Sequence, residues 1–208
     1  MLFSCKKDSY ESNKRDIGLS YENFTLKSSI TYKTTEILYD DFNNTIDTLK
    51  YELKEVNDTI FKDNLGRLSA RIYRYKRDSK NKPWQFINAV YKSIDEFSFE
   101  RIDNNKRQIK LSFPLSTDVV WNINQLNQDA AINVFYEFIH NKYNFQLFSF
   151  DSTLLIKSNK VNNPIREREY EEIYSKNIGL VYKKEVFIDK LNNSSRGFKI
   201  NQEIIEYE

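Results

Sequence analysis

Hydrophobic and polar residues alternate over many short stretches of the chain. Between residues 28 and 39, for example, Ile30, Tyr32 and Leu38 fall on one side of an extended chain and most of the polar residues on the other. Alternation with a period of two indicates a strand that is buried on one face. The same kind of pattern predicts strands at residues 45–56, 59–62, 67–77, 84–92, 96–103, 108–113, 148–157, 180–188 and 198–207.

Clusters of Asp, Asn and Ser separate these stretches, as at residues 40–44, 103–106 and 192–197. The chain has only four glycines and three prolines, and Asp and Asn can form turns because their side chains bond to the nearby backbone. Short strands at turn spacings of about 8–12 residues predict a mainly β fold. We expect an antiparallel meander that forms a sandwich or a barrel-like curved sheet.

Residues 127–141 fit two patterns. Ala131, Val134 and Phe138 have helical spacing, whereas the aromatic and branched run at residues 134–139 favours a strand. We expect a strand at residues 133–140 and keep a helix as the alternative. Trp121, just before this segment, is expected to be a buried anchor, since large aromatic side chains dominate core energetics.

Residues 166–176 are the one place where a helix is predicted. Tyr170, Ile173 and Tyr174 form a short apolar stripe among charged residues. Gly179 follows and could end a helix in a left-handed conformation. We therefore expect one short helix at residues 166–176, and a loop at residues 159–164.

Composition limits the classes of function. Lys plus Arg total 32 and Asp plus Glu total 30, a net charge of +2, and 15% of the residues are aromatic. Disordered chains combine high net charge with few aromatics, so this chain is expected to fold. Its mixed charges give no basic stripe of the kind that binds nucleic acid. No apolar run approaches the roughly 20 residues of a membrane-spanning helix.

The start of the chain resembles the lipobox of bacterial lipoproteins in Leu2, Ser4 and Cys5. In that family signal peptidase cuts before the cysteine, which then carries lipid chains. The resemblance implies that residues 1–4 are a signal-peptide remnant and that Cys5 anchors the protein to a membrane. An ordinary free thiol is the alternative. Residues 6–16 are polar and would form a tether spanning roughly 20 Å, with residues 17–208 as a single antiparallel β domain.

A second resemblance covers most of the body. Its motifs are YDDFNNTIDT at residues 39–48, RIYRYKRDS at 71–79 with Pro83-Trp84, Phe113-Pro114-Leu115 with Trp121, and YEEIY at 170–174 followed by Ile178-Gly179-Leu180-Val181-Tyr182-Lys183. Together they resemble an uncharacterised family of secreted lipoproteins of the Gram-negative envelope. The resemblance implies a β-rich domain at the outer membrane, lipid-anchored and facing the periplasm or the cell surface. The family supplies no catalytic residues, and its Gly-x-x-Trp-x-Tyr entry to the first strand is absent here.

Few residues suggest catalysis. Cys5 is the only cysteine, which excludes an internal disulfide and a thiolate zinc site. His140 is the only histidine and is expected to be structural or at the surface. No Gly-x-Ser-x-Gly, Walker A or dinucleotide motif occurs. We therefore expect no cofactor, no metal and no enzyme activity.

Carboxylates leave two further hypotheses open. Paired acids can hydrolyse glycosides, but Asp40 and Asp41 are expected to form a turn, and the glutamates at 167, 169, 171 and 172 to form a solvated helix face. Clustered oxygen ligands around residues 40–47 could hold calcium, although the spacing of an EF-hand is missing. A secreted hydrolase and a structural subunit of an envelope assembly remain the alternatives. The leading hypothesis is a binding or interaction module whose concave face is lined by aromatic rings.

Overall fold

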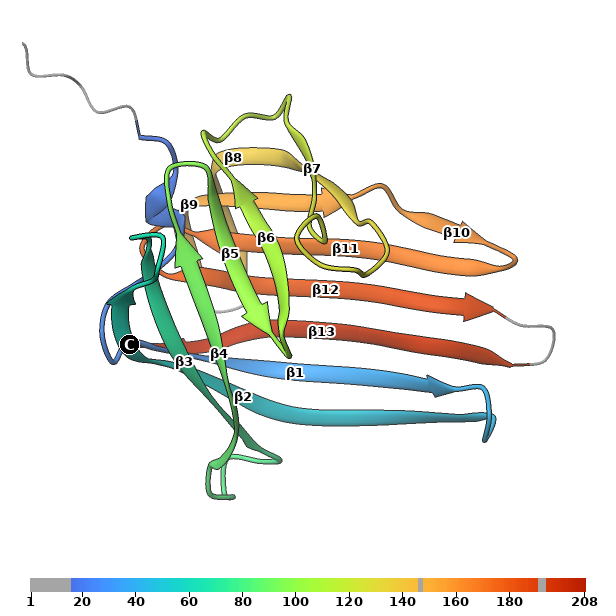
Figure 1. The fold of residues 1–208 in the computed structure, drawn as a ribbon. Helices are drawn as coiled ribbons and strands as arrows, with labels where there is room; N and C mark the ends of the chain where they lie inside the picture. The colour runs from blue at the N-terminus through green and yellow to red at the C-terminus, as the bar shows by residue number, and fades with distance from the viewer. Residues whose placement is uncertain (1–15, 146–147, 191–193) are drawn as a thin grey trace, which may run out of the picture.

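The structure is a computed structural model that describes residues 16–145, 148–190 and 194–208. Its described residues form a single antiparallel sheet of thirteen strands and one short 3-10 helix (Figure 1). The elements are η1 (Leu19–Tyr21), β1 (Ser29–Asp40), β2 (Thr45–Lys62), β3 (Leu68–Arg77), β4 (Gln85–Ile94), β5 (Ser98–Asp103), β6 (Lys106–Ser112), β7 (Val120–Asn122), β8 (Asn133–Phe145), β9 (Phe148–Ser158), β10 (Val161–Asn163), β11 (Arg166–Ser175), β12 (Gly179–Lys190) and β13 (Ser195–Tyr207).

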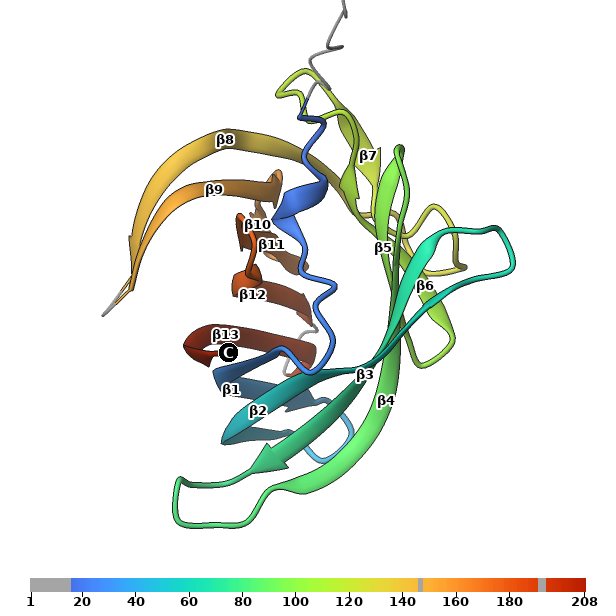
Figure 2. The same ribbon diagram turned by 90° about the vertical axis from the view of Figure 1, so that its left-hand side faces the viewer.

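Neighbours in the sequence are mostly neighbours in the sheet, whose order is β6-β5-β4-β3-β2-β1-β13-β12-β11-β9-β8-β7, with β10 paired to β11. The sheet curls until its two edges meet, so that the end view in Figure 2 is nearly a closed barrel. A few hydrogen bonds join β6 to the opposite edge. Trp121 donates its indole N–H to the carbonyl oxygen of Ile109 at 3.0 Å. Tyr136 donates its hydroxyl to the carbonyl oxygen of Ser112 at 2.7 Å.

The larger apolar core lies where these two edges of the sheet meet. It contains buried side chains from both edges and from β11, among them Leu111, Trp121, Tyr136 and Tyr174. Trp121 packs against Tyr136, with ring centroids 4.8 Å apart. The prediction that Trp121 is a buried anchor is therefore confirmed.

The predicted fold class is confirmed, including the strand preferred within residues 127–141, which is β8. The predicted helix at residues 166–176 is wrong, because this segment is strand β11. Tyr170, Glu172 and Tyr174 are all buried on one face, which is the period of a strand rather than of a helix. Part of the predicted loop at residues 159–164 is the short strand β10.

Residues 16–28, which we call the N-terminal strap, run across one end of the barrel (Figure 2). Backbone hydrogen bonds fix the strap at three places. Leu115 donates to the carbonyl of Ile17, Asn177 to that of Ser20, and Lys27 to that of Asn57. The strap therefore contacts the β6–β7 connection, the β11–β12 turn and β2. No helix among the described residues is long and apolar enough to span a bilayer.

Candidate functional site

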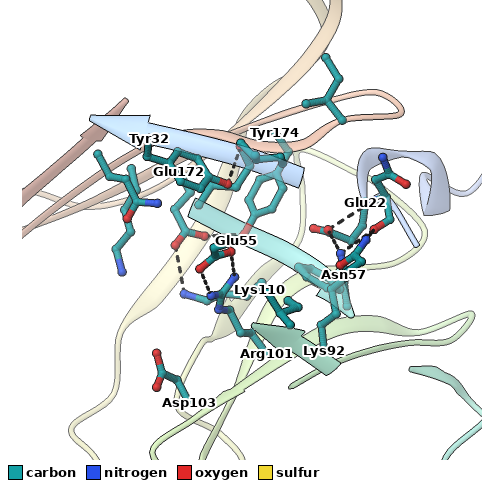
Figure 3. A pocket seen from close by; sticks show the side chains of 18 of the residues that line it. Glu22, Tyr32, Glu55, Asn57, Lys92, Arg101, Asp103, Lys110, Glu172 and Tyr174 are labelled. Carbon is teal, nitrogen blue, oxygen red and sulfur yellow. Dashed lines mark hydrogen bonds and ion pairs between the residues drawn. The ribbon is translucent and has the colours of Figure 1, made fainter. Parts of the chain in front are cut away.

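A cavity of about 120 Å³ lies inside the curled sheet, between the N-terminal strap and β1–β6 and β11–β13 (Figure 3). The aromatic rings expected on the concave face are present in part, because Tyr32, Phe99 and Tyr174 line the cavity. The lining is also rich in charge, with the acids Glu22, Glu55, Asp103 and Glu172 and the bases Arg74, Lys92, Arg101, Lys110 and Lys183. Drug-sized ligands occupy pockets of roughly 300–1,000 Å³, so this cavity suits a smaller molecule.

Strand register places these side chains on the inner face. Glu55 pairs with Ile30 of β1 on one side and with Arg74 of β3 on the other. Residues opposite one another in an antiparallel ladder share a face, so all three point inward. In the same way Lys183 of β12 lies opposite Gln202 of β13.

The first ion pair joins the N-terminal strap to the barrel wall. The Lys92 ammonium lies 2.7 Å from Glu22 Oε1 and also donates to the carbonyl oxygen of Asn23 at 2.5 Å. The Asn57 amide donates to the same carbonyl at 2.9 Å. Both charged side chains are less than one-tenth exposed, so the strap brings a carboxylate into the interior against a matched cation.

Glu55 is at the centre of the second group. Arg101 donates two hydrogen bonds to its carboxylate, one of them at 3.0 Å, and Arg74 Nε lies 3.5 Å from Glu55 Oε1. Burial alone would raise the pKa of Glu55, but the charge and hydrogen bonds of Arg101, helped by Arg74, outweigh burial and lower it to about 2. Glu55 is therefore ionised throughout the physiological range.

Glu172 lies beside Glu55 in Figure 3 and has partners of its own. Lys110 donates to Oε1 at 3.0 Å and Tyr174 to Oε2 at 2.7 Å. Burial opposes the charge, but Lys110 and Lys183 and the tyrosine hydrogen bonds together lower the pKa of Glu172. Burial lowers the pKa of Lys110 itself, although Glu172 acts against that shift. Both Lys110 and Glu172 are at most 4% exposed.

The remaining pairs complete the charge balance of the lining. Asp103 and Arg74 meet at 2.6 Å, and Lys183 pairs with the neighbouring Glu185 at 2.9 Å. Each of the five cations of the lining therefore has a carboxylate partner, and each carboxylate has a cation. The lining itself has five cations and four carboxylates, and Glu185, which is not part of the lining, supplies the fifth carboxylate as the partner of Lys183.

Three polar groups of the lining remain without a hydrogen bond among the described residues. The side-chain amide of Gln202, which is 9% exposed, has neither a donor nor an acceptor partner there. Arg74 Nε and Asp103 Oδ1 are buried and have no hydrogen bond either. Buried polar groups are normally paired. Arg74 Nε and Asp103 Oδ1 are buried within the wall, so the Gln202 amide is the group of these three that a ligand in the cavity could reach.

The residues singled out from the sequence lie elsewhere. Asp40 closes the β1–β2 turn, as predicted, because its carboxylate accepts hydrogen bonds from the backbone of Phe42 and Asn43. His140 is exposed, and its Nδ1 lies 2.8 Å from the hydroxyl of Tyr21. Neither Asp40 nor His140 lines the cavity. Cys5 lies outside the described residues, so its lipidation stays a prediction.

The glutamates of β11 divide between the two faces of the sheet. Glu167 and Glu169 form ion pairs with lysines, at 3.4 Å to Lys199 and at 2.8 Å to Lys184, whereas Glu172 faces the cavity. The prediction of one solvated helix face is therefore wrong for Glu172. No group of three or more His, Cys, Asp or Glu residues in the described parts of the chain is placed to hold a metal ion.

Sequence reasoning missed the cavity residues, although one signal was present. Lys92 interrupts a hydrophobic face, since Val90 and Ile94 on either side of it are buried. A lysine on the buried face of a strand needs a partner or a function. Its partner Glu22 is 70 residues away in the sequence, and no local pattern could have identified that residue.

Comparisons with known proteins add little to this description. No family model matches the chain, and no curated protein matches it. A crystal structure of a candidate lipoprotein from Parabacteroides distasonis ATCC 8503 is similar at 10% identity and a TM-score of 0.48, covering 90% of this chain and 98% of that one. A candidate exported protein with a YmcC-like fold from Bacteroides fragilis NCTC 9343 is similar at 11% identity and a TM-score of 0.43, covering 88% and 97%. Both scores are below 0.5, so neither likeness carries an argument about this chain.

Proposed function

We propose that this protein is a non-catalytic, lipid-anchored module of the bacterial cell envelope that binds a small polar molecule inside its curled sheet. The observation that carries the binding proposal is the side-chain amide of Gln202, which lines the cavity and has no hydrogen-bond partner among the described residues. The charged groups of the lining are held by ion pairs with one another or with neighbouring side chains. The Gln202 amide is therefore free to bind a molecule inside the cavity.

The carboxylates of the cavity support binding rather than hydrolysis. Glycoside hydrolysis by two carboxylic acids needs one whose pKa is raised so that it can give up a proton. The pKa values of both Glu55 and Glu172 are lowered by their cationic partners. A secreted hydrolase remains the second candidate, because Glu55 and Glu172 line the same cavity, and a structural subunit remains the third.

The anchor rests on the resemblance of Leu2, Ser4 and Cys5 to a lipobox. Several lipid chains on one cysteine would hold the protein on a bilayer far longer than a single chain would. The proposed site is the outer membrane, with the domain facing the periplasm or the cell surface. Intact mass of protein taken from native membranes tests this step, with a Cys5→Ser variant as the control. An uncut Met1 and an unmodified thiol would refute the anchor.

Thermal unfolding in the presence of small polar compounds tests the binding step. The panel includes neutral sugars, amino acids, dicarboxylates and inorganic phosphate. We expect at least one compound to raise the melting temperature of the wild type, to lose this effect in Gln202→Leu and to keep it in Gln128→Leu, which changes an exposed glutamine outside the cavity. If no compound stabilises the wild type, the binding proposal fails. Turnover of a glycoside by the purified protein would favour the hydrolase instead.

A further inference from the structure

The charge balance of the cavity narrows the class of ligand. Glu22, Glu55, Asp103, Glu172 and Glu185 each have a cationic partner within 3.0 Å in the cavity wall. An ion that enters such a site loses its hydration, which costs several kcal/mol in a buried environment. The charged groups of the wall are already paired with one another, so no unpaired charge of opposite sign would offset that cost.

The unpaired groups indicate what a ligand must offer. The Gln202 amide offers one donor and one acceptor to the cavity. Arg74 Nε and Asp103 Oδ1 also have no hydrogen bond, but both atoms are buried within the wall, and Arg74 Nε faces Glu55 Oε1 at 3.5 Å. A hydroxyl group can donate and accept a hydrogen bond. A molecule that carries several hydroxyls can therefore pair with both ends of the Gln202 amide without bringing a charge into the cavity.

From these observations we infer that the cavity binds a neutral, hydroxyl-rich molecule of about the size of one monosaccharide. This inference rests on the proposed binding function and adds the class of its ligand. Gln202 is the residue that selects for it, because its amide is neutral and is unpaired within the described structure. The volume of about 120 Å³ limits the occupant to a single small unit.

Three sugars of nearly equal shape and different charge test this inference by isothermal titration calorimetry. Glucose is neutral, glucuronate is an anion and glucosamine is a cation at pH 7, and the galactose series provides the same comparison in a second stereochemistry. We expect a neutral sugar to bind, and its charged counterparts to bind on the order of tenfold more weakly or less. Affinity for the neutral sugar should also be unchanged between low and high salt, since no ligand charge is screened.

Variants connect the affinity to the cavity. Gln202→Leu is expected to reduce the affinity for the neutral sugar at least tenfold, and Gln128→Leu to leave it unchanged. Circular dichroism confirms that both variants are folded. If a variant with native circular dichroism binds like the wild type, the sugar lies elsewhere and the inference is overturned.

The outcomes separate this inference from the proposed function. If glucuronate, glucosamine or a charged compound of the wider panel binds more tightly than every neutral sugar, the ligand class is wrong but the binding module stands. If the wild type binds neither series and nothing in the panel, water alone fills the cavity and both fail.

Discussion

Gln202 lies on the inner face of β13, opposite Lys183 and Thr34 in the ladders. The Thr34 hydroxyl beside it is buried without a hydrogen bond, whereas the Gln202 amide faces the cavity. Gln202→Leu, which keeps most of the volume and removes an amide that has no protein partner, should leave the free energy of unfolding unchanged or raise it by up to about 1 kcal/mol. Urea denaturation of the ligand-free protein measures it. Gln128→Leu should change the value by less than about 0.5 kcal/mol, and a clear loss of stability in Gln202→Leu would mean that the amide has a partner.

Gly197 provides a second prediction at the residue scale. Its φ is +134°, and a Cβ there would lie 1.8 Å from the carbonyl oxygen of Phe187 on β12. Gly197→Ala should therefore cost more than the roughly 1–3 kcal/mol of backbone strain alone. Gly66→Ala is the matched control, because its φ is +77° and a Cβ would meet no atom within 4 Å. Equal losses of unfolding free energy in the two variants would contradict the close approach of β12 and β13.

The burial of Glu172 could not be predicted from the sequence around it. The run of charged residues around Glu172 predicts a solvated helix face, because polar and charged residues normally lie on the solvent side of an element. Glu167 and Glu169 are only partly exposed and pair with lysines, and Glu172 is 1% exposed. Its cationic partner Lys110 is 62 residues earlier. Because burial of a charge depends on such a distant partner, the sequence predicted the turn at Asp40 but not the cavity.

At the scale of elements, the N-terminal strap is held by Glu22 and Lys92. Lys92→Met leaves the Glu22 carboxylate buried without its cation, which should cost about 3–5 kcal/mol unless the strap detaches. Hydrogen exchange at residues 16–28 should then become faster than in the wild type. Lys27→Met is the control on the same segment, since Lys27 is 67% exposed and pairs with Asp58 at 3.3 Å, a contact worth about 0–1 kcal/mol. Unchanged exchange in Lys92→Met would mean that other contacts hold the strap.

Strand positions were largely predictable, because alternation and turn residues are local properties. Two elements show the limits. Strand β2 runs from Thr45 to Lys62, but the sequence suggested two strands, since a register shift between Asn57 and Thr59 interrupts the alternation. The apolar stripe of β11 fitted a helix because its inner face mixes Tyr170 and Tyr174 with a glutamate. Neither the meeting of β6 with β7 and β8 nor the strap contacts follow from a local pattern.

For the whole molecule, the ion pairs of the cavity connect stability to pH. The pKa of Glu55 in the folded protein is about 2, below its ordinary value of 4.5. The unfolded chain therefore binds more protons than the folded chain between these values, and stability rises with pH there. The contribution of Glu55, about 3 kcal/mol, is fully present above pH 4.5. It is lost as the pH falls toward 2.

A double variant isolates this contribution. Glu55→Gln together with Arg101→Met removes both members of the pair, so that neither charge is left buried alone. In urea denaturation at several pH values between 2 and 6, the free energy of unfolding of the double variant should fall less steeply with decreasing pH than that of the wild type. Some pH dependence should remain, because the pKa of Glu172 is also lowered. Adding a saturating ligand should raise the free energy of unfolding across this range, since it binds only the folded state. If the free energy of unfolding falls as steeply with decreasing pH in the double variant as in the wild type, carboxylates outside the Glu55–Arg101 pair set the acid stability of the barrel.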